Sequence, residues 1–341
     1  MLTDATIERI LAALPRLTVA VVGDLFLDRY LDLDGRLTEP SLETGLDAYQ
    51  VVRVRPSPGA AGTVINNLVA LGVGRVCPVA VIGDDGEGYE LRRALGQLGA
   101  VDAGRVLTRP DRFTPTYTKP MLQRPGEPPR ELNRLDIKNR TPLPTDAEAQ
   151  LVRAAEAAWG EANAVIILDQ VSEADCGVVT ARVRRRLGEL GQQDPGRPAL
   201  ADSRERIRLF DHLWLKPNGR ECRQAVPGQD DVAAGAAALA KRVGCPVFCT
   251  VGEAGMIVAD PRGPSSRCTA VPAYPVSGPI DVVGAGDSCN AGLACALAAG
   301  CSLEEAAAFG NLVASITIRQ IGTTGTASPG QVRGRWAEVR G

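Results

Sequence analysis

The chain has 341 residues, of which 45% are hydrophobic and 23% are charged, a composition typical of folded globular proteins rather than of disordered segments. Its formal net charge is −2 at pH 7 and no long basic run occurs, which argues against a dedicated nucleic-acid-binding or membrane-surface protein. The nine cysteines lack C-x-x-C pairs and the spacings of metal sites, so we interpret them as reduced core residues and expect a cytoplasmic protein. Any catalytic triad would depend on His212, the only histidine, and no Walker-type or dinucleotide-binding glycine motif is present.

The N-terminal half combines buried strands with two stretches of another kind. The run at 18–24 has the length and β-branched content of a buried parallel strand. Residues 25–57 and 105–137 instead alternate polar and apolar side chains around turn residues, which predicts strands exposed on one face. An amphipathic N-terminal helix, helices over 59–71 and 90–98, and a strand over 75–82 complete this half.

Strands and helices alternate regularly in the second half. We predict helices over 146–159, 174–189, 231–243, 285–299 and 303–319, and strands over 164–169, 199–202, 213–218 and 246–252, with two exposed strands around 256–273. This pattern is typical of an α/β fold with a doubly wound, mostly parallel sheet flanked by helices. We expect a single domain over 1–341, with a small β-sheet lid formed by strands within 29–57 and 105–137. Ligands bind such sheets beyond the carboxyl ends of the strands.

The segment PIDVVGAGDSCNAGLACALAAG at 279–300 carries the strongest chemical signal. Gly284 and Gly286 allow backbone N–H groups to converge at the start of a small-residue helix. Those groups and the helix dipole would form an anion hole, which suits a transferring phosphoryl group. Asp287 lies beside it, and we expect its carboxylate to stay ionised there and to accept a proton from an alcohol. The alternative is that Asp287 is simply the N-cap of the helix.

This segment resembles the D-[TV]-x-G-A-G-D signature of the ribokinase, or phosphofructokinase-B, family of carbohydrate kinases. VVGDLFLDRY at 21–30, PGAAGTVINNLVALG at 58–72, LKPNGRE at 215–221 and CTVGEAGMIV at 249–258 resemble further segments of that family, in the same order along the chain. The resemblance implies a ribokinase-like fold and an enzyme that uses ATP and Mg²⁺.

The resemblance also implies roles for particular residues. Asp287 would be the catalytic base, and Gly284, Ala285 and Gly286 would form the anion hole. The acceptor would be bound by Asp28, Gly59, Ala60, Thr63, Lys119 and Arg134. The nucleotide would be bound by Asn218, Thr250, Gly252, Gly255 and Asn311. Glu221 would hold Mg²⁺ largely through water, and Asp281 is a candidate ligand for a monovalent cation such as K⁺.

Within the family, GDLFLDRY, TPTYTKPML, LNRLD and the tail IGTTGTASP at 321–329 are most similar to kinases of D-glycero-β-D-manno-heptose 7-phosphate. No H-x-G-H of a cytidylyltransferase occurs, so we expect a stand-alone kinase. The departures fall on the acceptor side: Ala60 and Thr63 replace a glycine and an asparagine, and a D-Y-x-K-G lysine is missing. Arg204, with Lys119 and Arg134, is a candidate substitute for the missing positive charge.

The sequence therefore predicts transfer of the γ-phosphate of ATP to a hydroxyl of a sugar or sugar phosphate, with the anomeric hydroxyl of a heptose 7-phosphate as one acceptor. Two alternatives stay open: a kinase of the same fold for another sugar or a nucleoside, and a non-catalytic sensor that binds a sugar or nucleotide. We expect no nucleic-acid or membrane partner, and the exposed lid strands are a candidate homodimer interface.

Overall fold

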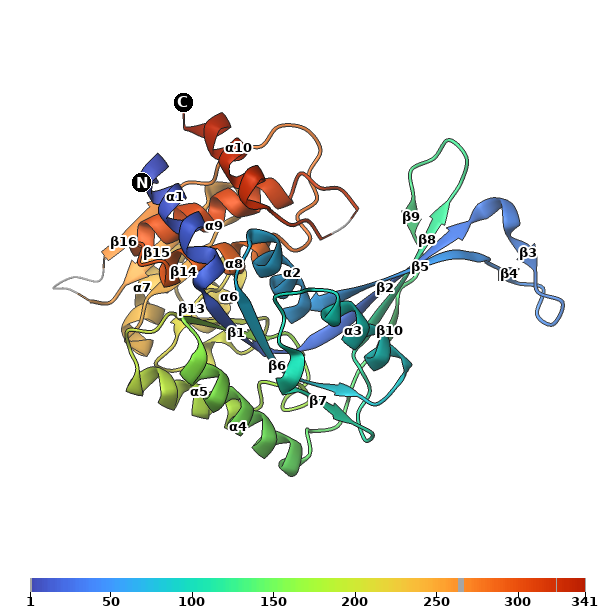
Figure 1. The fold of residues 1–341 in the computed structure, drawn as a ribbon, viewed down its shortest axis with the longest axis horizontal. Helices are drawn as coiled ribbons and strands as arrows, with labels where there is room; N and C mark the ends of the chain where they lie inside the picture. The colour runs from blue at the N-terminus through green and yellow to red at the C-terminus, as the bar shows by residue number, and fades with distance from the viewer. Residues whose placement is uncertain (1, 263–266, 323, 341) are drawn as a thin grey trace.

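A nine-stranded sheet forms the centre of the computed structural model, which describes residues 2–262, 267–322 and 324–340 (Figure 1). The strands follow the order β16-β15-β14-β13-β12-β11-β1-β6-β7, and all pairs are parallel except β14–β15 and β15–β16. Its strands are β1 (Thr18–Gly23), β6 (Arg75–Gly83), β7 (Val106–Arg109), β11 (Ala164–Asp169), β12 (Ala199–Ser203), β13 (Trp214–Leu215), β14 (Val247–Thr250), β15 (Met256–Asp260) and β16 (Arg267–Val271). β1 and β11 are buried along almost their whole length, as their apolar runs predict.

Helices cover both faces of this sheet, in the doubly wound arrangement that the alternating pattern predicts (Figure 1). One layer contains α2, α8 and α9, and the other contains α4, α5, α6 and α7. The helices are α1 (Asp4–Ala13), α2 (Ala61–Leu71), α3 (Gly86–Gly96), α4 (Thr145–Glu161), α5 (Ala181–Gln193), α6 (Gly219–Ala225), α7 (Val232–Val243), α8 (Ala285–Ala298), α9 (Leu303–Thr317) and α10 (Pro329–Val339). Within the described ranges, no helix is long and apolar enough to cross a membrane.

A smaller sheet projects from one end of the main body (Figure 1). Its order is β10-β8-β2-β5, with β9 paired to β8; β2 and β8 are parallel and the other pairs are antiparallel. A separate two-stranded ribbon, β3 with β4, lies at its tip. These strands are β2 (Leu25–Asp34), β3 (Glu39–Pro40), β4 (Asp47–Ala48), β5 (Val51–Ala60), β8 (Thr116–Gln123), β9 (Arg130–Glu131) and β10 (Leu135–Ile137).

The structure differs from the sequence prediction at several element ends. β7 falls within 105–137 but joins the edge of the large sheet. Helix α5 begins at Ala181, not at 174, because Thr180 caps it by accepting a hydrogen bond from the Val183 N–H. Helix α10 was not predicted, although Ser328, Pro329 and Gln331 form a capping box with a proline in the first turn. Parts of two predicted segments, residues 263–266 and 323, lie outside the described residues.

Candidate active site

The turn at 284–287 lies at the start of α8, on the carboxyl side of the parallel strands. Gly284 is the N-cap residue with φ +79°, a conformation that glycine adopts without steric cost. A Cβ atom at this position would lie 3.3 Å from Cγ2 of Thr324 and 3.4 Å from Cγ2 of Thr63. The turn therefore brings the acceptor loop, the C-terminal tail and the helix N-terminus together. The Ala285 N–H donates to the Val282 carbonyl oxygen at 3.1 Å. Among the described residues, the N–H groups of Gly284 and Gly286 are therefore the ones available to an anion.

Asp287 is the third residue of α8 and does not cap it, since no side chain caps this helix. The N-cap alternative for Asp287 is therefore wrong. Burial of the half-buried carboxyl, reinforced by the charge of Asp202, raises its pKa to about 7. We expected the helix start to keep this carboxylate ionised; that expectation was wrong, because desolvation and a like charge outweigh the dipole. A carboxyl that titrates near neutrality is suited to accepting a proton.

Lys216, which the sequence analysis did not single out, lies beneath this turn. Its side chain is buried and its Nζ lies 2.9 Å from Oδ2 of Asp202, which also accepts a hydrogen bond of 2.8 Å from Asn290. A Cβ on Gly286 would lie 3.9 Å from Nζ. Asp202 holds the pKa of this lysine above its usual range despite burial, so it carries a positive charge next to the anion hole. A lysine within an apolar strand needs a buried partner, and that is the signal by which the sequence reveals it.

Asn218 and Glu221 are bound to each other at the start of α6. The Asn218 side chain accepts a hydrogen bond of 2.9 Å from the Glu221 N–H, and Glu221 accepts one of 2.8 Å from the Asn218 N–H. The pair thus forms a capping box, which fixes both side chains at the mouth of the site. Burial and the charge of Asp202 raise the pKa of Glu221, an environment that a cation would relieve.

Asp281 holds two loop segments together. Its oxygens accept hydrogen bonds from the N–H groups of Val283 at 3.0 Å and of Gly322 at 3.2 Å. Across the described residues, no cluster of three or more histidine, cysteine or acidic side chains is arranged to hold a metal ion. The role of Asp281 as a ligand of a monovalent cation stays a prediction.

A cleft of about 1020 Å³ runs from the helix turn along the ends of β14 and β16. Its volume is at the upper end of that of small-molecule sites. Apolar side chains such as Val251, Val282 and Ile318 line much of it, which suits a planar base. The cleft brings together all the residues predicted to bind a nucleotide and two of the anion hole, namely Asn218, Thr250, Gly252, Gly255, Asn311, Ala285 and Gly286.

Two of these residues have identifiable structural tasks in the cleft. Asn311 donates hydrogen bonds of 3.2 and 3.1 Å to the carbonyl oxygens of Val271 and Pro272, which fixes one wall. A Cβ on Gly255, where φ is +95°, would lie 2.2 Å from the Val271 oxygen, so only glycine fits there.

Asp28 lies on the opposite side of the turn, buried between the two lid segments. Its Oδ1 lies 3.1 Å from Nζ of Lys119, which also contacts the hydroxyl of Tyr30 at 3.3 Å. The charge of Asp28 holds the Lys119 pKa above its usual range, against the effect of burial. A Cβ on Gly59 would lie only 2.7 Å from Oδ2 of Asp28, so this glycine makes room for the carboxylate. Three of the predicted acceptor-binding residues therefore lie together.

The other predicted acceptor residues lie around this pair. Ala60 adopts φ 51° and ψ −115°, a strained conformation for a residue with a Cβ. Thr63 is buried in the first turn of α2, facing Gly284. Arg134 is exposed, pairs with Asp136 at 2.6 Å and lies over the ring of Tyr117 at 4.0 Å from its centroid.

A family model described as pfkB family carbohydrate kinase matches residues 17–329 of this chain. Among curated relatives, the bifunctional protein HldE of Trichlorobacter lovleyi is 31% identical over 333 residues, covering 96% of this chain and 64% of its own length. That of Mesorhizobium japonicum is 32% identical over 324 residues, with 93% and 62% covered. The chain thus spans less than two thirds of the length of these relatives.

Solved structures share the fold at lower identity. Ribokinase of Arabidopsis thaliana, complexed with ribose and ATP, superposes with a TM-score of 0.66 at 18% identity, covering 94% of this chain and 98% of its own. Phosphofructokinase-2 of Escherichia coli, in complex with fructose-6-phosphate, gives a TM-score of 0.68 at 18% identity, with 95% and 99% covered. The fold is therefore ribokinase-like, as expected, and the family match extends over nearly the whole chain. This chain belongs to the pfkB family of carbohydrate kinases.

Proposed function

We propose that this carbohydrate kinase transfers the γ-phosphate of ATP to a hydroxyl of a sugar or sugar phosphate at the start of α8. One observation carries the proposal: the turn at 284–287 borders both the large cleft and the region around Asp28. Ala285 and Gly286 line the large cleft, whereas Gly284 faces Thr63 in the first turn of α2, which follows the Gly59 segment that packs against Asp28. A donor in the cleft and an acceptor at Asp28 would meet at this turn.

The residues of the turn have complementary roles in this proposal. The N–H groups of Gly284 and Gly286 would bind the transferring group, where negative charge accumulates. Lys216 would add a fixed positive charge below them. Asp287 would accept the hydroxyl proton as the new O–P bond forms, and Asp28 would hold the acceptor through its hydroxyl groups.

The nucleotide and its cations would occupy the cleft and its mouth. Asn218, Thr250, Gly252, Gly255 and Asn311 are the proposed nucleotide contacts. Mg²⁺ would lie near Glu221, bound mainly through water and phosphate oxygens, since Mg²⁺ retains several waters in such sites. When bound, Mg²⁺ would neutralise negative charge on the phosphates during transfer. K⁺ near Asp281 rests on the family resemblance alone.

For the acceptor, we favour a sugar phosphate, with a heptose 7-phosphate first. The curated relatives in the comparison are named HldE, and one structural neighbour is described in complex with fructose-6-phosphate. The contacts of Lys119 with Asp28 and Tyr30 provide one fixed cation near the acceptor. Arg134 and Arg204 stay candidates for the remaining charge. Another sugar, a nucleoside, or binding without catalysis are the alternatives.

We further propose that the smaller sheet is a lid that closes over the acceptor and excludes water, and that it joins two copies of the chain. β5 is the outer strand of this sheet, and Val51, Val52 and Val54 on it are exposed. An exposed apolar edge strand tends to pair with another chain.

The test is ADP release from ATP-Mg²⁺ with a panel of sugars, hexose and heptose phosphates, and nucleosides. Asp287→Asn should lower kcat by about 10²- to 10⁴-fold on the best acceptor, the usual contribution of a positioned general base. ADP binding, measured by calorimetry, should be unchanged in the variant. Turnover by the variant at the wild-type rate would exclude Asp287 as the base. No turnover on any acceptor, with ADP still bound, would favour the sensor.

A further inference from the structure

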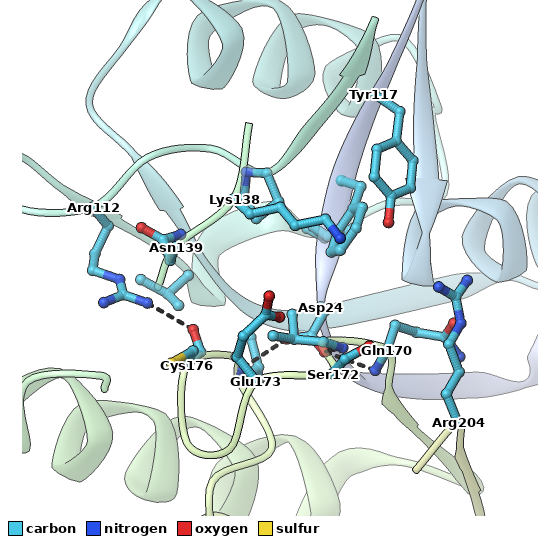
Figure 2. A pocket seen from close by; sticks show the side chains of 17 residues that line it. Asp24, Arg112, Tyr117, Lys138, Asn139, Gln170, Ser172, Glu173, Cys176 and Arg204 are labelled. Carbon is cyan, nitrogen blue, oxygen red and sulfur yellow. Dashed lines mark hydrogen bonds between the residues drawn. The ribbon is translucent and has the colours of Figure 1, made fainter. Parts of the chain in front are cut away.

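A second cavity, of about 50 Å³, lies at the base of the lid, beside the acceptor site (Figure 2). It is lined by the end of β1, the first residues of β2, and the segments around 112–117, 138–139 and 170–178. Three cationic side chains, Arg112, Lys138 and Arg204, contribute to its wall. In Figure 2 the Lys138 amino group and the Tyr117 hydroxyl extend into the same space, and Arg204 approaches from the other side.

These three cations have little compensation from acidic side chains. Arg112 is 6% exposed and donates only to uncharged oxygens of Thr141, Pro142 and Cys176. Its Nε is buried and has no hydrogen-bond partner among the residues that the structure describes. Among the described residues Arg204 forms no ion pair, although the neighbouring Arg206 pairs with Asp169.

Lys138 is only weakly paired, at 4.0 Å from Asp136, and the two acidic groups of the cavity are already engaged. Asp24 accepts hydrogen bonds from the N–H groups of Gln170, Val171 and Val178, at 2.8, 3.0 and 2.6 Å. Glu173 lies 3.6 Å from Arg140. Of the three cations, Arg112 is buried, Lys138 is partly buried and Arg204 is exposed. Burying Arg112 without a counter-charge is costly, so the cavity favours an anion.

The cavity and Asp28 are neighbours along β2 and β8, because Phe26 and Tyr117 line the cavity. Phe26 and Asp28 project from the same face of β2, since side chains alternate along a strand. Tyr117 stands opposite Asp28 in the register and packs against Phe26, with 5.0 Å between ring centroids. Arg204 lies close enough to Asp287 to act on its pKa, in the lowering direction. An acceptor held between Asp28 and Asp287 therefore has this cavity at one end.

Hydrogen bonds tie together two of the segments that carry the cationic side chains. The Asn139 side chain accepts a hydrogen bond of 3.0 Å from the Phe113 N–H and donates one of 2.8 Å to the Phe113 carbonyl oxygen. The bonds from Arg112 to Thr141 and Pro142 tie the same two segments together. Lys138, next to Asn139, is thus anchored to the rim, and a preorganised site loses less entropy on binding.

We propose that this cavity is the subsite for a phosphate monoester of the acceptor, held by Lys138, Arg204 and the Tyr117 hydroxyl, with Arg112 supplying charge in the wall. The inference rests on the proposed function and deepens it, because it selects a phosphorylated acceptor over a neutral sugar. The volume corresponds to roughly three to five water positions, which suits the oxygens of one phosphate group and not a whole sugar. Lysine and arginine are the usual partners of phosphate.

Direct binding of inorganic phosphate to the full chain, measured by calorimetry without nucleotide, is the first test. Lys138→Gln with Arg204→Gln should weaken phosphate binding at least tenfold and leave ADP binding unchanged. The matched control is Lys241→Gln with Arg208→Gln, two exposed residues outside the cavity, which should bind phosphate like the wild type. Equal phosphate affinity in the cavity variant and the wild type would overturn the subsite.

Kinetics on a matched pair of acceptors, a heptose and its 7-phosphate, separate the subsite from the proposed function. Lys138→Gln should raise KM for the phosphorylated acceptor at least tenfold, with KM for the neutral sugar changed less than twofold. Similar changes for both acceptors would contradict the phosphate assignment, as would competition by a sugar carboxylate but not by phosphate. The protein could also bind phosphate through Lys138 and Arg204 and yet turn over no acceptor. That outcome would support the subsite and contradict the proposed kinase activity.

Discussion

The carboxyl of Asp287 links pH to both activity and stability. Its pKa of about 7 in the folded protein exceeds its usual value of 3.8. If Asp287 is the base, kcat/KM should rise with pH through about 7, as the carboxylate becomes ionised. The folded state also holds this proton more tightly than the unfolded state, so the contribution to stability is lost as pH rises from about 4 to 7.

Asp287→Asn should therefore be more stable than the wild type despite its lower kcat, with an advantage that grows between pH 4 and pH 7. Urea denaturation of both proteins across this range measures the difference directly. A constant difference at all pH values would mean that Asp287 does not titrate in the window that its surroundings impose.

Lys216 and Asp202 form a buried ion pair whose structural and chemical roles can be separated. Lys216→Met leaves the Asp202 carboxylate without its counter-charge and should cost about 3–5 kcal/mol of unfolding free energy. If Lys216 also serves the anion hole, kcat should fall at least 100-fold. In the double variant with Asp202→Asn the unpaired charge is gone, so most of the stability should return while kcat stays low. Recovery of both would assign the pair a purely structural role.

The neighbouring residues Gly59 and Ala60 should respond in opposite ways to substitution. Gly59→Ala places a Cβ 2.7 Å from the Asp28 carboxylate, which must then move. KM for the acceptor should rise about tenfold or more, with ADP affinity unchanged. Ala60→Gly relieves the positive φ and should add about 1 kcal/mol to the unfolding free energy, the difference between strain relief and the greater entropy of glycine in the unfolded chain. Steady-state kinetics and urea titrations of both variants check the pair.

At the scale of elements, the apolar patterns predict the main sheet and most of its helices because each pattern encodes burial directly. β1 and β11 are uninterrupted apolar runs, and α9 begins with a capping box of Ser302 and Glu305. The strand predicted over 213–218 is present but is only two residues long, Trp214–Leu215. Helix α6 was not predicted, because its seven residues are too few for a period to emerge. The start of α5 was placed too early, since Glu173 to Gly177 form turns around Asp24, a contact between distant segments that local sequence does not contain.

The candidate site likewise contains residues that are close together in the sequence, which could be predicted, and residues that only the fold brings together. The turn at 284–287 is local, so its glycines and Asp287 stand out in one short segment of sequence. The cavity cations are not local: Arg112, Lys138 and Arg204 come from three connections far apart in the chain. Only the fold brings them together, and only the side-chain contacts reveal how little they are compensated: among the described residues, Arg112 and Arg204 form no ion pair and Lys138 lies 4.0 Å from Asp136. The raised pKa of Asp287 was missed for the same reason, because both its burial and the nearby Asp202 charge come from segments distant in the chain.

At the scale of the whole molecule, the projecting lid leaves a long strand edge that a second copy of the chain would cover. β5 runs for ten residues on the outside of the small sheet, and Leu42 and Leu46 near its tip are fully or largely exposed. We predict a dimer through this edge, stable at micromolar concentration. A specific interface of the usual size buries about 1,200–2,000 Å² in total. A single exposed valine side chain accounts for only a small part of that area, so one substitution would not be enough to disrupt the dimer.

Two substitutions on the edge should therefore act together. Val52→Lys with Val54→Lys introduces like charges facing their counterparts and should shift the protein to monomer in sedimentation equilibrium, with an unchanged far-ultraviolet spectrum. Tyr89→Lys replaces a more exposed apolar side chain, on α3 and not on a strand of the small sheet, and should leave the dimer intact. Because the lid also borders the acceptor site, the monomer should show a raised KM for the acceptor and unchanged ADP binding. A dimer that survives both lysines uses another surface, and a monomeric wild type would mean that the exposed valines serve lid closure alone.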